Sequence, residues 1–242
     1  TNFFLNWSDF EKFEFNLPLL EEQERLAKIL WKIEEIKKQN TEIINSLSSY
    51  IDISFNELLN KNELCSLDYY CNNIKNSHTK NQIFNVAIDL DCIVPFAGDI
   101  SFFKYEITEK SSYNKFEKND IIFGKLRPYL GKYWISNTNG ICNGEIMIFK
   151  ANIKTAISGF LYLIISSKKF IEYNNKLSYG TKMPRTSWKI ASKFKCPLLT
   201  IEEQDHYYKK ISQIIEIQSF TRDKIKVLNN LQKQILREAF NV

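Results

Sequence analysis

One stretch of the sequence occurs twice, and this repeat constrains the fold more than any other feature. A shift of 181 positions, without a gap, aligns Trp7 with Trp188 and residues 21–23 (EEQ) with residues 202–204 (EEQ). The same register continues over some 54 positions. A repeat at a fixed offset is typical of one structural unit that is used twice. Because the two copies lie far apart, we expect pseudo-two-fold symmetry and not a stack of repeats.

A long helix is predicted after each copy of the Glu-Glu-Gln sequence. At 21–60 and 202–240, apolar residues recur every three or four positions, and neither Gly nor Pro interrupts them. The Glu pair at each start complements the positive end of the helix dipole. A helix of about 40 residues is roughly 60 Å long. Since both segments carry the same apolar pattern, we expect them to pair as an antiparallel coiled coil.

The segment between the two helices has the pattern of a mixed domain. Short apolar runs bounded by Gly and Asn predict strands at 83–94, 120–126, 132–136 and 144–150. A helix is predicted at 154–175, followed by a loop at 176–188. The predicted fold class is therefore α+β, with one mixed α/β domain flanked by two long helices. The expected organisation is a tail at 1–20, a first helix at 21–60, the mixed domain at 61–200 and a second helix at 201–242.

The positive charge is concentrated in the mixed domain. Residues 61–200 hold 20 Lys and Arg against 11 Asp and Glu, a balance of +9, whereas the whole chain carries +5. A basic domain between near-neutral flanks indicates a polyanionic partner for that domain. The alternative is a solvated surface without such a partner.

The chain lacks the motifs of several enzyme classes. It contains no GxGxxG, GxxxxGK[ST], HExxH or [DN]PP[YFW], so the usual nucleotide, zinc-protease and amino-methyltransferase sites are not expected. His78 and His206 are expected on loop and helix surfaces. Asp89 and Asp91 are expected on one face of a strand, where two carboxylates without a third ligand favour an edge position over a metal site. We therefore predict a binding protein, with no catalytic residue and no metal.

The cysteine and hydropathy patterns indicate the cellular compartment of the protein. The five cysteines lack CxxC spacing, which favours buried thiols in a reducing cytoplasm over a zinc site or a disulfide framework. No run of 18 apolar residues occurs. We therefore expect no membrane-spanning helix and no membrane partner.

Two loops of the mixed domain carry residues suited to DNA. The first, FGKLRPYLGK at 123–132, places cations and a Tyr between two glycines, which permit close backbone approach to phosphates. The second, YGTKMPRTSW at 179–188, offers hydroxyl donors and an Arg whose planar fork suits a guanine edge. Each loop could instead be a solubilising turn. The candidate DNA-binding residues are Lys125, Arg127, Tyr129, Lys132, Thr181, Lys182, Arg185, Thr186, Ser187 and Lys189.

Side-chain chemistry suggests different roles within this set. Arg185 is assigned to base readout, whereas Lys125, Lys132 and Lys182 are point charges assigned to phosphates. Arg127 has an alternative role in an internal ion pair with Glu145.

These segments resemble those of a known protein family. The run GTKMPRTSWKIASKFKCPLLTIEEQ at 180–204, followed by a long helix, is similar to the end of a target recognition domain and its spacer helix in specificity (S) subunits of Type I restriction-modification systems. FGKLRPYLGKY, VAIDLD and CNGEIMIF resemble further segments of that domain. The resemblance covers essentially the whole chain and indicates the C-terminal half of such a subunit or a half-length form.

The resemblance implies a non-catalytic subunit. Its recognition domain would read one half of a bipartite double-stranded DNA target, and its paired helices would dock methyltransferase and restriction subunits. S-adenosylmethionine would bind the methyltransferase, so no cofactor is expected on this chain. The aromatic tail at 1–20 would be the end of a preceding recognition domain that packs on a second half subunit or in a homodimer. The alternative from a different class is a coiled-coil assembly scaffold whose middle domain binds a protein.

Overall fold

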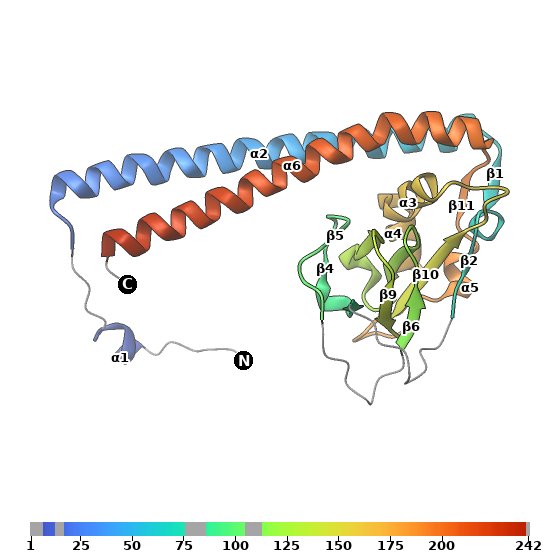
Figure 1. Ribbon diagram of the computed structural model, residues 1–242, viewed down its shortest axis with the longest axis horizontal. Coiled ribbons are helices and arrows are strands. Elements are labelled where there is room, and N and C mark those ends of the chain that lie inside the picture. The colour runs from blue at the N-terminus through green and yellow to red at the C-terminus, as the bar shows by residue number, and fades with distance from the viewer. Residues whose placement is uncertain (1–6, 13–16, 76–85, 105–112, 241–242) are drawn as a thin grey trace. The chain divides into compact units, whose positions relative to one another are not determined.

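The computed structural model describes residues 7–12, 17–75, 86–104 and 113–240 (Figure 1). The chain divides into two compact units, one made of residues 1–48 and 214–242 and the other of residues 49–213. Both long helices contribute to both units. Of the predicted tail, a short helix α1 (Trp7–Phe10) is described, and its Trp7 ring is 71% exposed. The tail residues Phe3, Phe4, Phe13 and Phe15 lie outside the described residues.

The two long helices form where the sequence predicts them. Helix α2 spans Leu20–Lys61 and α6 spans Ile201–Phe240. In the first unit, Lys37 Nζ donates to Gln232 Oε1 at 3.1 Å. Further along α2, the hydroxyl of Ser48 accepts from Gln218 Nε2 at 2.8 Å. Rising numbers on α2 meet falling numbers on α6, so the predicted antiparallel pairing is confirmed.

The repeated Glu-Glu-Gln sequence has a structural role at the start of α6. Glu203 accepts from the backbone N–H and the hydroxyl of Thr200, at 2.8 and 2.9 Å, and so caps the helix. Gln204 is fully buried and donates to the carbonyl oxygens of Thr155 and Leu199, at 2.8 and 3.0 Å. Its side-chain oxygen accepts from the N–H of Ile157 at 3.1 Å. One glutamine therefore joins the helix to the mixed domain.

The described part of the mixed domain contains two principal sheets. The first has the order β2-β10-β7-β8 and is antiparallel throughout: β2 (Cys71–Asn73), β10 (Ile146–Ala151), β7 (Ile121–Gly124), β8 (Tyr133–Ile135). The second has the order β3-β9-β6, and its β3–β9 pair is parallel: β3 (Ala87–Ile88), β9 (Gly140–Asn143), β6 (Tyr113–Phe116). Two further antiparallel pairs are formed by β1 (Leu64–Ser66) with β11 (Lys195–Pro197) and by β4 (Ile93–Val94) with β5 (Asp99–Ile100).

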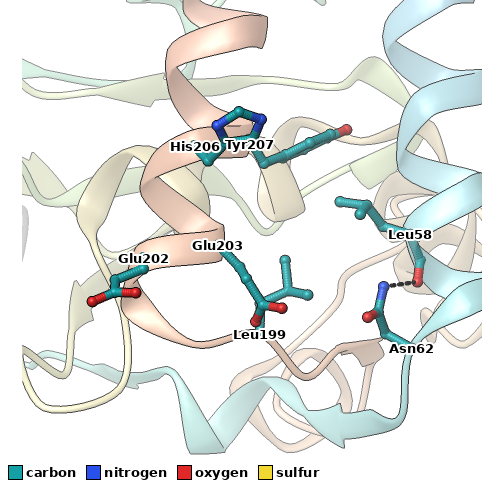
Figure 2. Close-up of a pocket in the computed structure, with 7 residues that line it drawn as sticks. All are labelled: Leu58, Asn62, Leu199, Glu202, Glu203, His206 and Tyr207. Carbon is teal, nitrogen blue, oxygen red and sulfur yellow. Dashed lines mark hydrogen bonds between the residues drawn. The ribbon is translucent and has the colours of Figure 1, made fainter.

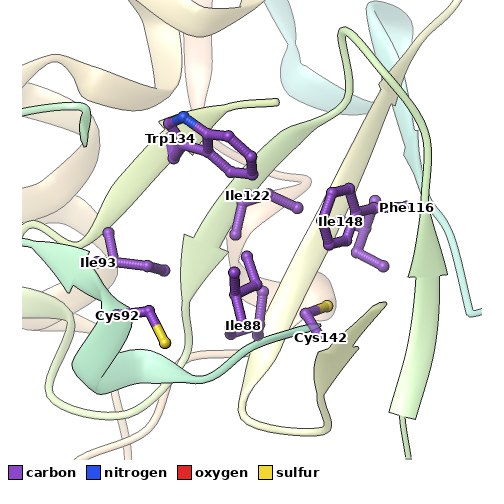
Figure 3. Packing of buried hydrophobic residues seen from close by; sticks show 9 residues of the cluster. Ile88, Cys92, Ile93, Phe116, Ile122, Trp134, Cys142 and Ile148 are labelled. Carbon is purple, nitrogen blue, oxygen red and sulfur yellow. The ribbon is translucent and has the colours of Figure 1, made fainter. Parts of the chain in front are cut away.

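Buried side chains from both sheets meet in one core cluster (Figure 3). It combines Trp134 of β8, Ile122 of β7 and Ile148 of β10 with Phe116 of β6 and Cys142 of β9. The rings of Phe116 and Trp134 pack edge to face, with centroids 5.9 Å apart. Helix α3 (Ser158–Ser166) also packs on β7, β8 and β10. The core therefore holds the strands that carry the first basic loop.

The predicted strands at 120–126, 132–136 and 144–150 are confirmed as β7, β8 and β10. The segment predicted as strand at 83–94 contains two short strands, β3 and β4, and its residues 83–85 lie outside the described residues. After β3 the chain forms a 3-10 turn at Leu90–Cys92, in which the Cys92 N–H donates to the Asp89 carbonyl oxygen at 3.1 Å. Asp89 and Asp91 therefore do not share a strand face, because the turn separates them.

The helix predicted at 154–175 is two helices, α3 and α4 (Lys168–Lys176). Ser167 separates them in an extended conformation (φ −64°, ψ 143°). Its hydroxyl donates to the Ile164 carbonyl oxygen at 2.7 Å and accepts from the Phe170 N–H at 3.2 Å. The serine thus closes one helix and caps the next. The loop predicted at 176–188 leads to a short helix α5 (Trp188–Ala191). Within the described ranges, no helix has the length and apolarity needed to cross a membrane.

Candidate nucleic-acid interface

The two basic loops lie side by side and are joined through their backbones. The Arg127 N–H donates to the Pro184 carbonyl oxygen at 2.7 Å, and the Thr186 N–H donates to the Lys125 carbonyl oxygen at 3.0 Å. Leu126 and Arg185 form an antiparallel bridge between these two bonds. Residues 123–132 and 179–189 therefore form one surface feature, the basic ribbon.

Local backbone geometry shapes both halves of the basic ribbon. Arg127 has a left-handed conformation (φ 50°, ψ 62°) and precedes a 3-10 turn at Pro128–Leu130. In the other half, Tyr179 and Arg185 exchange two backbone hydrogen bonds of 3.0 and 2.9 Å, which close the loop between them. Gly180 has φ +93°, a value that few other residues adopt. Both halves are therefore held by backbone bonds that do not depend on the basic side chains.

Arg185 is fixed by an ion pair within the domain. Its Nε donates to Glu145 Oε2 at 3.0 Å, and both side chains are 39% exposed. The ion pair considered for Arg127 with Glu145 is thus made by Arg185, and no ion pair of Arg127 is found in the part of the chain that the structure describes. Because Nε makes this contact, the two terminal nitrogens of Arg185 keep the geometry of a bidentate donor.

Lys125 lies in an unusual electrostatic environment. Burial lowers the pKa of its ammonium group, and the positive charges of Lys75 and Arg185 lower it further, whereas Glu145 opposes them. Desolvation together with neighbouring like charges is a property of many functional sites. Lys75 is one of the charges that act on Lys125, but the sequence analysis did not include it among the candidate residues. It lies about 50 positions before the ribbon and in no basic run.

The other candidate residues differ in how far their side chains are exposed to solvent. The side chains of Arg127, Tyr129, Thr181, Lys182 and Lys189 are exposed, and Ser187 is half-buried at the start of α5. Lys132 is half-buried and its ammonium donates to the Leu90 carbonyl oxygen, so its charge is already engaged. The ribbon therefore exposes cations on both halves.

Thr186 is a correction to the sequence-based set. It was expected to offer a hydroxyl to DNA, but it is 1% exposed and its Oγ1 donates to Asn174 Oδ1 at 2.6 Å. Asn174 lies on α4 and is itself fully buried. Thr186 therefore attaches the ribbon to the domain and is not available to DNA.

An exposed aromatic residue beside the ribbon was also missed. The Phe96 N–H donates to the Gly131 carbonyl oxygen at 2.9 Å, and a Cβ at Gly131 would lie 2.5 Å from the Phe96 ring. Phe96 has φ 56° and is 54% exposed. The glycine thus lets this ring lie against the ribbon turn, and no basic or periodic pattern in the sequence marks the position.

A separate pocket of about 430 Å³ lies where α2 ends and α6 begins (Figure 2). Leu58, Leu199 and Tyr207 supply apolar surface, while Glu202 and Glu203 supply negative charge. His206 lies on the same wall and is exposed on α6, as predicted. An acidic pocket does not suit a polyanion, so the basic ribbon is the better candidate site.

The acidic residues near β3 do not form a metal site. Lys104 Nζ lies 2.6 Å from Asp89 Oδ2 and 3.3 Å from Asp91 Oδ1. A lysine between two carboxylates occupies the position that a cation would need. Among the residues placed by the structure, no group of three or more His, Cys, Asp or Glu side chains could hold a metal ion.

Comparisons with known proteins identify relatives of this chain in sequence and in fold. Over 134 residues, 54% of this chain, the sequence is 25% identical to the specificity subunit of the Type I restriction enzyme EcoDI of Escherichia coli. The fold matches the HsdS subunit from Thermoanaerobacter tengcongensis with a TM-score of 0.52 and 15% identity. This chain resembles Type I specificity subunits in sequence and fold.

The resemblance inferred from the sequence is therefore confirmed. The S subunit of the Type I restriction-modification system from M. genitalium matches with a TM-score of 0.58 and 14% identity, over 91% of this chain and 59% of that one. The T. tengcongensis subunit is matched over 93% of this chain and 59% of that one. The region shared with the E. coli specificity subunit is 30% of that protein. The chain thus spans only part of its relatives. No protein-family model matches the chain.

Proposed function

We propose that this chain is a DNA-reading specificity component of a Type I restriction-modification complex. Its mixed domain would contact one half of a bipartite double-stranded target through the basic ribbon. Its paired helices would dock methyltransferase and restriction subunits, which would carry the catalysis and the S-adenosylmethionine. The observation that carries the proposal is the backbone junction of the two basic loops, because it gathers cations from distant segments at one place.

The geometry supports distinct roles within the ribbon. Arg185 is held through Nε by Glu145, so its terminal nitrogens are pre-oriented for a guanine edge. Exposed Lys182 and Lys189 and half-buried Lys125 would contact phosphates. Exposed Lys75 adds positive charge near Lys125, which favours a polyanion at this surface. Tyr129 is 44% exposed on the ribbon turn and can donate to a phosphate or stack.

A second half subunit or a second copy of the chain would complete the bipartite reader. The proposal rests on the sequence of the tail, which repeats packing residues from the end of the mixed domain. It has Thr1, Phe4 and Ser8 where the second copy has Lys182, Arg185 and Lys189. A closed two-fold arrangement would place two recognition domains on one duplex.

A salt series tests the DNA-binding part of the proposal. The purified full chain is titrated with random-sequence duplex DNA at increasing salt, and binding is followed by fluorescence anisotropy. The logarithm of the association constant should fall linearly with the logarithm of the salt concentration, by about 0.9 for each phosphate neutralised. A chain that acts only as a protein scaffold would show weak binding without this slope.

Charge-reversal variants locate the surface. Lys182→Glu and Lys189→Glu should weaken binding strongly, because they place negative charge on the ribbon. Lys224→Glu is the matched control, since this residue is on α6 in the first unit and changes the net charge equally. Equal weakening by all three variants would place the DNA elsewhere and contradict the proposal.

A further inference from the structure

Two cysteines face each other where the chain enters and leaves the mixed domain. Cys65 of β1 and Cys196 of β11 are direct partners in the antiparallel register, and their sulfur atoms are 3.9 Å apart. Directly opposed residues in such a pair have Cα atoms about 4.5–5.5 Å apart, within the range that a disulfide bridges. A disulfide bond of about 2.05 Å therefore needs the two sulfurs to approach by side-chain rotation, without a change of register.

The two thiols have different environments. Cys65 is half-buried, whereas Cys196 is fully buried. The hydrogen bond between the two thiols is the largest cause that lowers the pKa of the Cys65 thiol, and Tyr70 and Lys195 act in the same direction. The same hydrogen bond and burial raise the pKa of the Cys196 thiol. Cys65 is thus the thiol that ionises first and the one that a small oxidant can reach.

We propose that Cys65 and Cys196 form a reversible disulfide on exposure to a peroxide. The Cys65 thiolate attacks one peroxide oxygen, the O–O bond breaks, and a sulfenic acid forms as hydroxide leaves and takes up a proton as water. Cys196 sulfur then attacks the Cys65 sulfur, and the sulfenic oxygen leaves as a second water molecule with the thiol proton. Two thiols are oxidised and one peroxide is reduced to two waters. A reducing thiol restores both cysteines.

The position of this bond gives it a structural consequence. Strand β1 begins at Leu64, shortly after α2 ends at Lys61, and β11 ends at Pro197, shortly before α6 begins at Ile201. The disulfide would close a covalent ring around nearly the whole mixed domain. It would therefore restrict opening of the strand pair and raise the thermal stability of that domain. This inference does not depend on DNA binding.

The remaining cysteines provide an internal comparison. Cys71, Cys92 and Cys142 are buried. Burial raises the pKa of the Cys142 thiol to about 12 and also raises that of Cys71. These thiols are therefore expected to react slowly. Cys71 lies near enough to influence Cys196 electrostatically, so it is the competing partner that the experiment must distinguish.

The test uses the reduced full chain, treated with hydrogen peroxide at neutral pH. Free-thiol counting should show the loss of two of the five thiols. Peptide mass spectrometry should find Cys65 joined to Cys196, the melting temperature should rise, and dithiothreitol should reverse both effects. A disulfide that joins Cys71 to Cys196, or no internal disulfide at all, would overturn the proposal.

Two variants test which of the two cysteines is oxidised first. In Cys196→Ser, the sulfenic acid should persist on Cys65 and be captured by dimedone, whereas Cys65→Ser should neither be captured nor gain stability. Melting curves recorded before oxidation show whether each variant is folded, and Cys92→Ala is the control that should still form the bond. Capture on another cysteine in Cys196→Ser would show that Cys65 is not the reactive thiol.

Discussion

Glu145 and Arg185 are 40 positions apart in the sequence and form a 3.0 Å ion pair at the base of the basic ribbon. Glu145 follows β9 and precedes β10, whereas Arg185 lies in the second basic loop. Burial lowers the pKa of nearby Lys125, and the Glu145 carboxylate opposes this lowering. One acidic residue thus orients the proposed base-reading side chain and supports the charge of a proposed phosphate contact.

Substitution of Arg185 should reduce discrimination more than affinity. Arg185→Ala is expected to cost about 1–3 kcal/mol on the duplex selected by the wild-type chain, with little change on a scrambled duplex. Lys182→Ala is the comparison. It should weaken binding to both duplexes alike and lower the slope of the salt dependence by about one unit. Paired titrations measure both effects. If Arg185→Ala lowered the affinity for both duplexes equally, this residue would contact the DNA phosphate backbone and not a base.

The pKa of Lys125 should respond to its neighbours in opposite directions. Its folded pKa lies below the ordinary 10.5, so the folded state binds fewer protons and gains stability as pH rises between the two values. Lys75→Ala removes a repelling charge and should raise the pKa, whereas Glu145→Gln removes an attracting charge and should lower it. NMR titration of the lysine side chain measures both. Shifts of the same sign would show that these charges do not act on Lys125.

Loss of the Thr186 hydroxyl should destabilise the domain. Thr186→Val keeps the volume but leaves Asn174 Oδ1 buried without its 2.6 Å donor. The expected cost is about 1–3 kcal/mol in the free energy of unfolding, measured by urea denaturation. Ser187→Ala is the adjacent control and should cost less, because Ser187 is half-buried and makes no side-chain cap bond. A neutral Thr186→Val would contradict the attachment role.

The two copies of the repeated glutamine should differ in importance. Gln204→Leu leaves two backbone carbonyls and one N–H without their partner, and is expected to cost at least about 3 kcal/mol. Gln23→Leu removes one bond, to the Pro18 carbonyl oxygen at 2.7 Å, at a half-buried position, and should cost about 1 kcal/mol or less. Urea denaturation of both variants gives the comparison. Equal costs would mean that burial in the mixed domain does not distinguish the two copies.

Local patterns in the sequence determined several features directly. The apolar period and the absence of Gly and Pro predicted both long helices to within one or two residues, because helix periodicity is a property of neighbouring positions. The repeat predicted their antiparallel pairing, and apolar runs predicted β7, β8 and β10. The two basic loops were found by composition and turn residues. The turn at Leu90–Cys92 and the break at Ser167 were missed. The break at Ser167 depends on one hydroxyl, which no periodic pattern marks.

Only the tertiary structure decided how the candidate residues combine. The sequence suggested Arg127 as a partner for Glu145 and assigned Arg185 to base readout, whereas in the structure it is Arg185 that pairs with Glu145. The tertiary structure also buried Thr186 against α4 and brought Lys75 to Lys125. Such choices depend on which strands and loops meet across long separations. The pairing of strands and loops depends on how side chains from distant segments pack into a common core. The hydrophobic period of one segment shows only which of its faces is buried and does not show which segment covers that face.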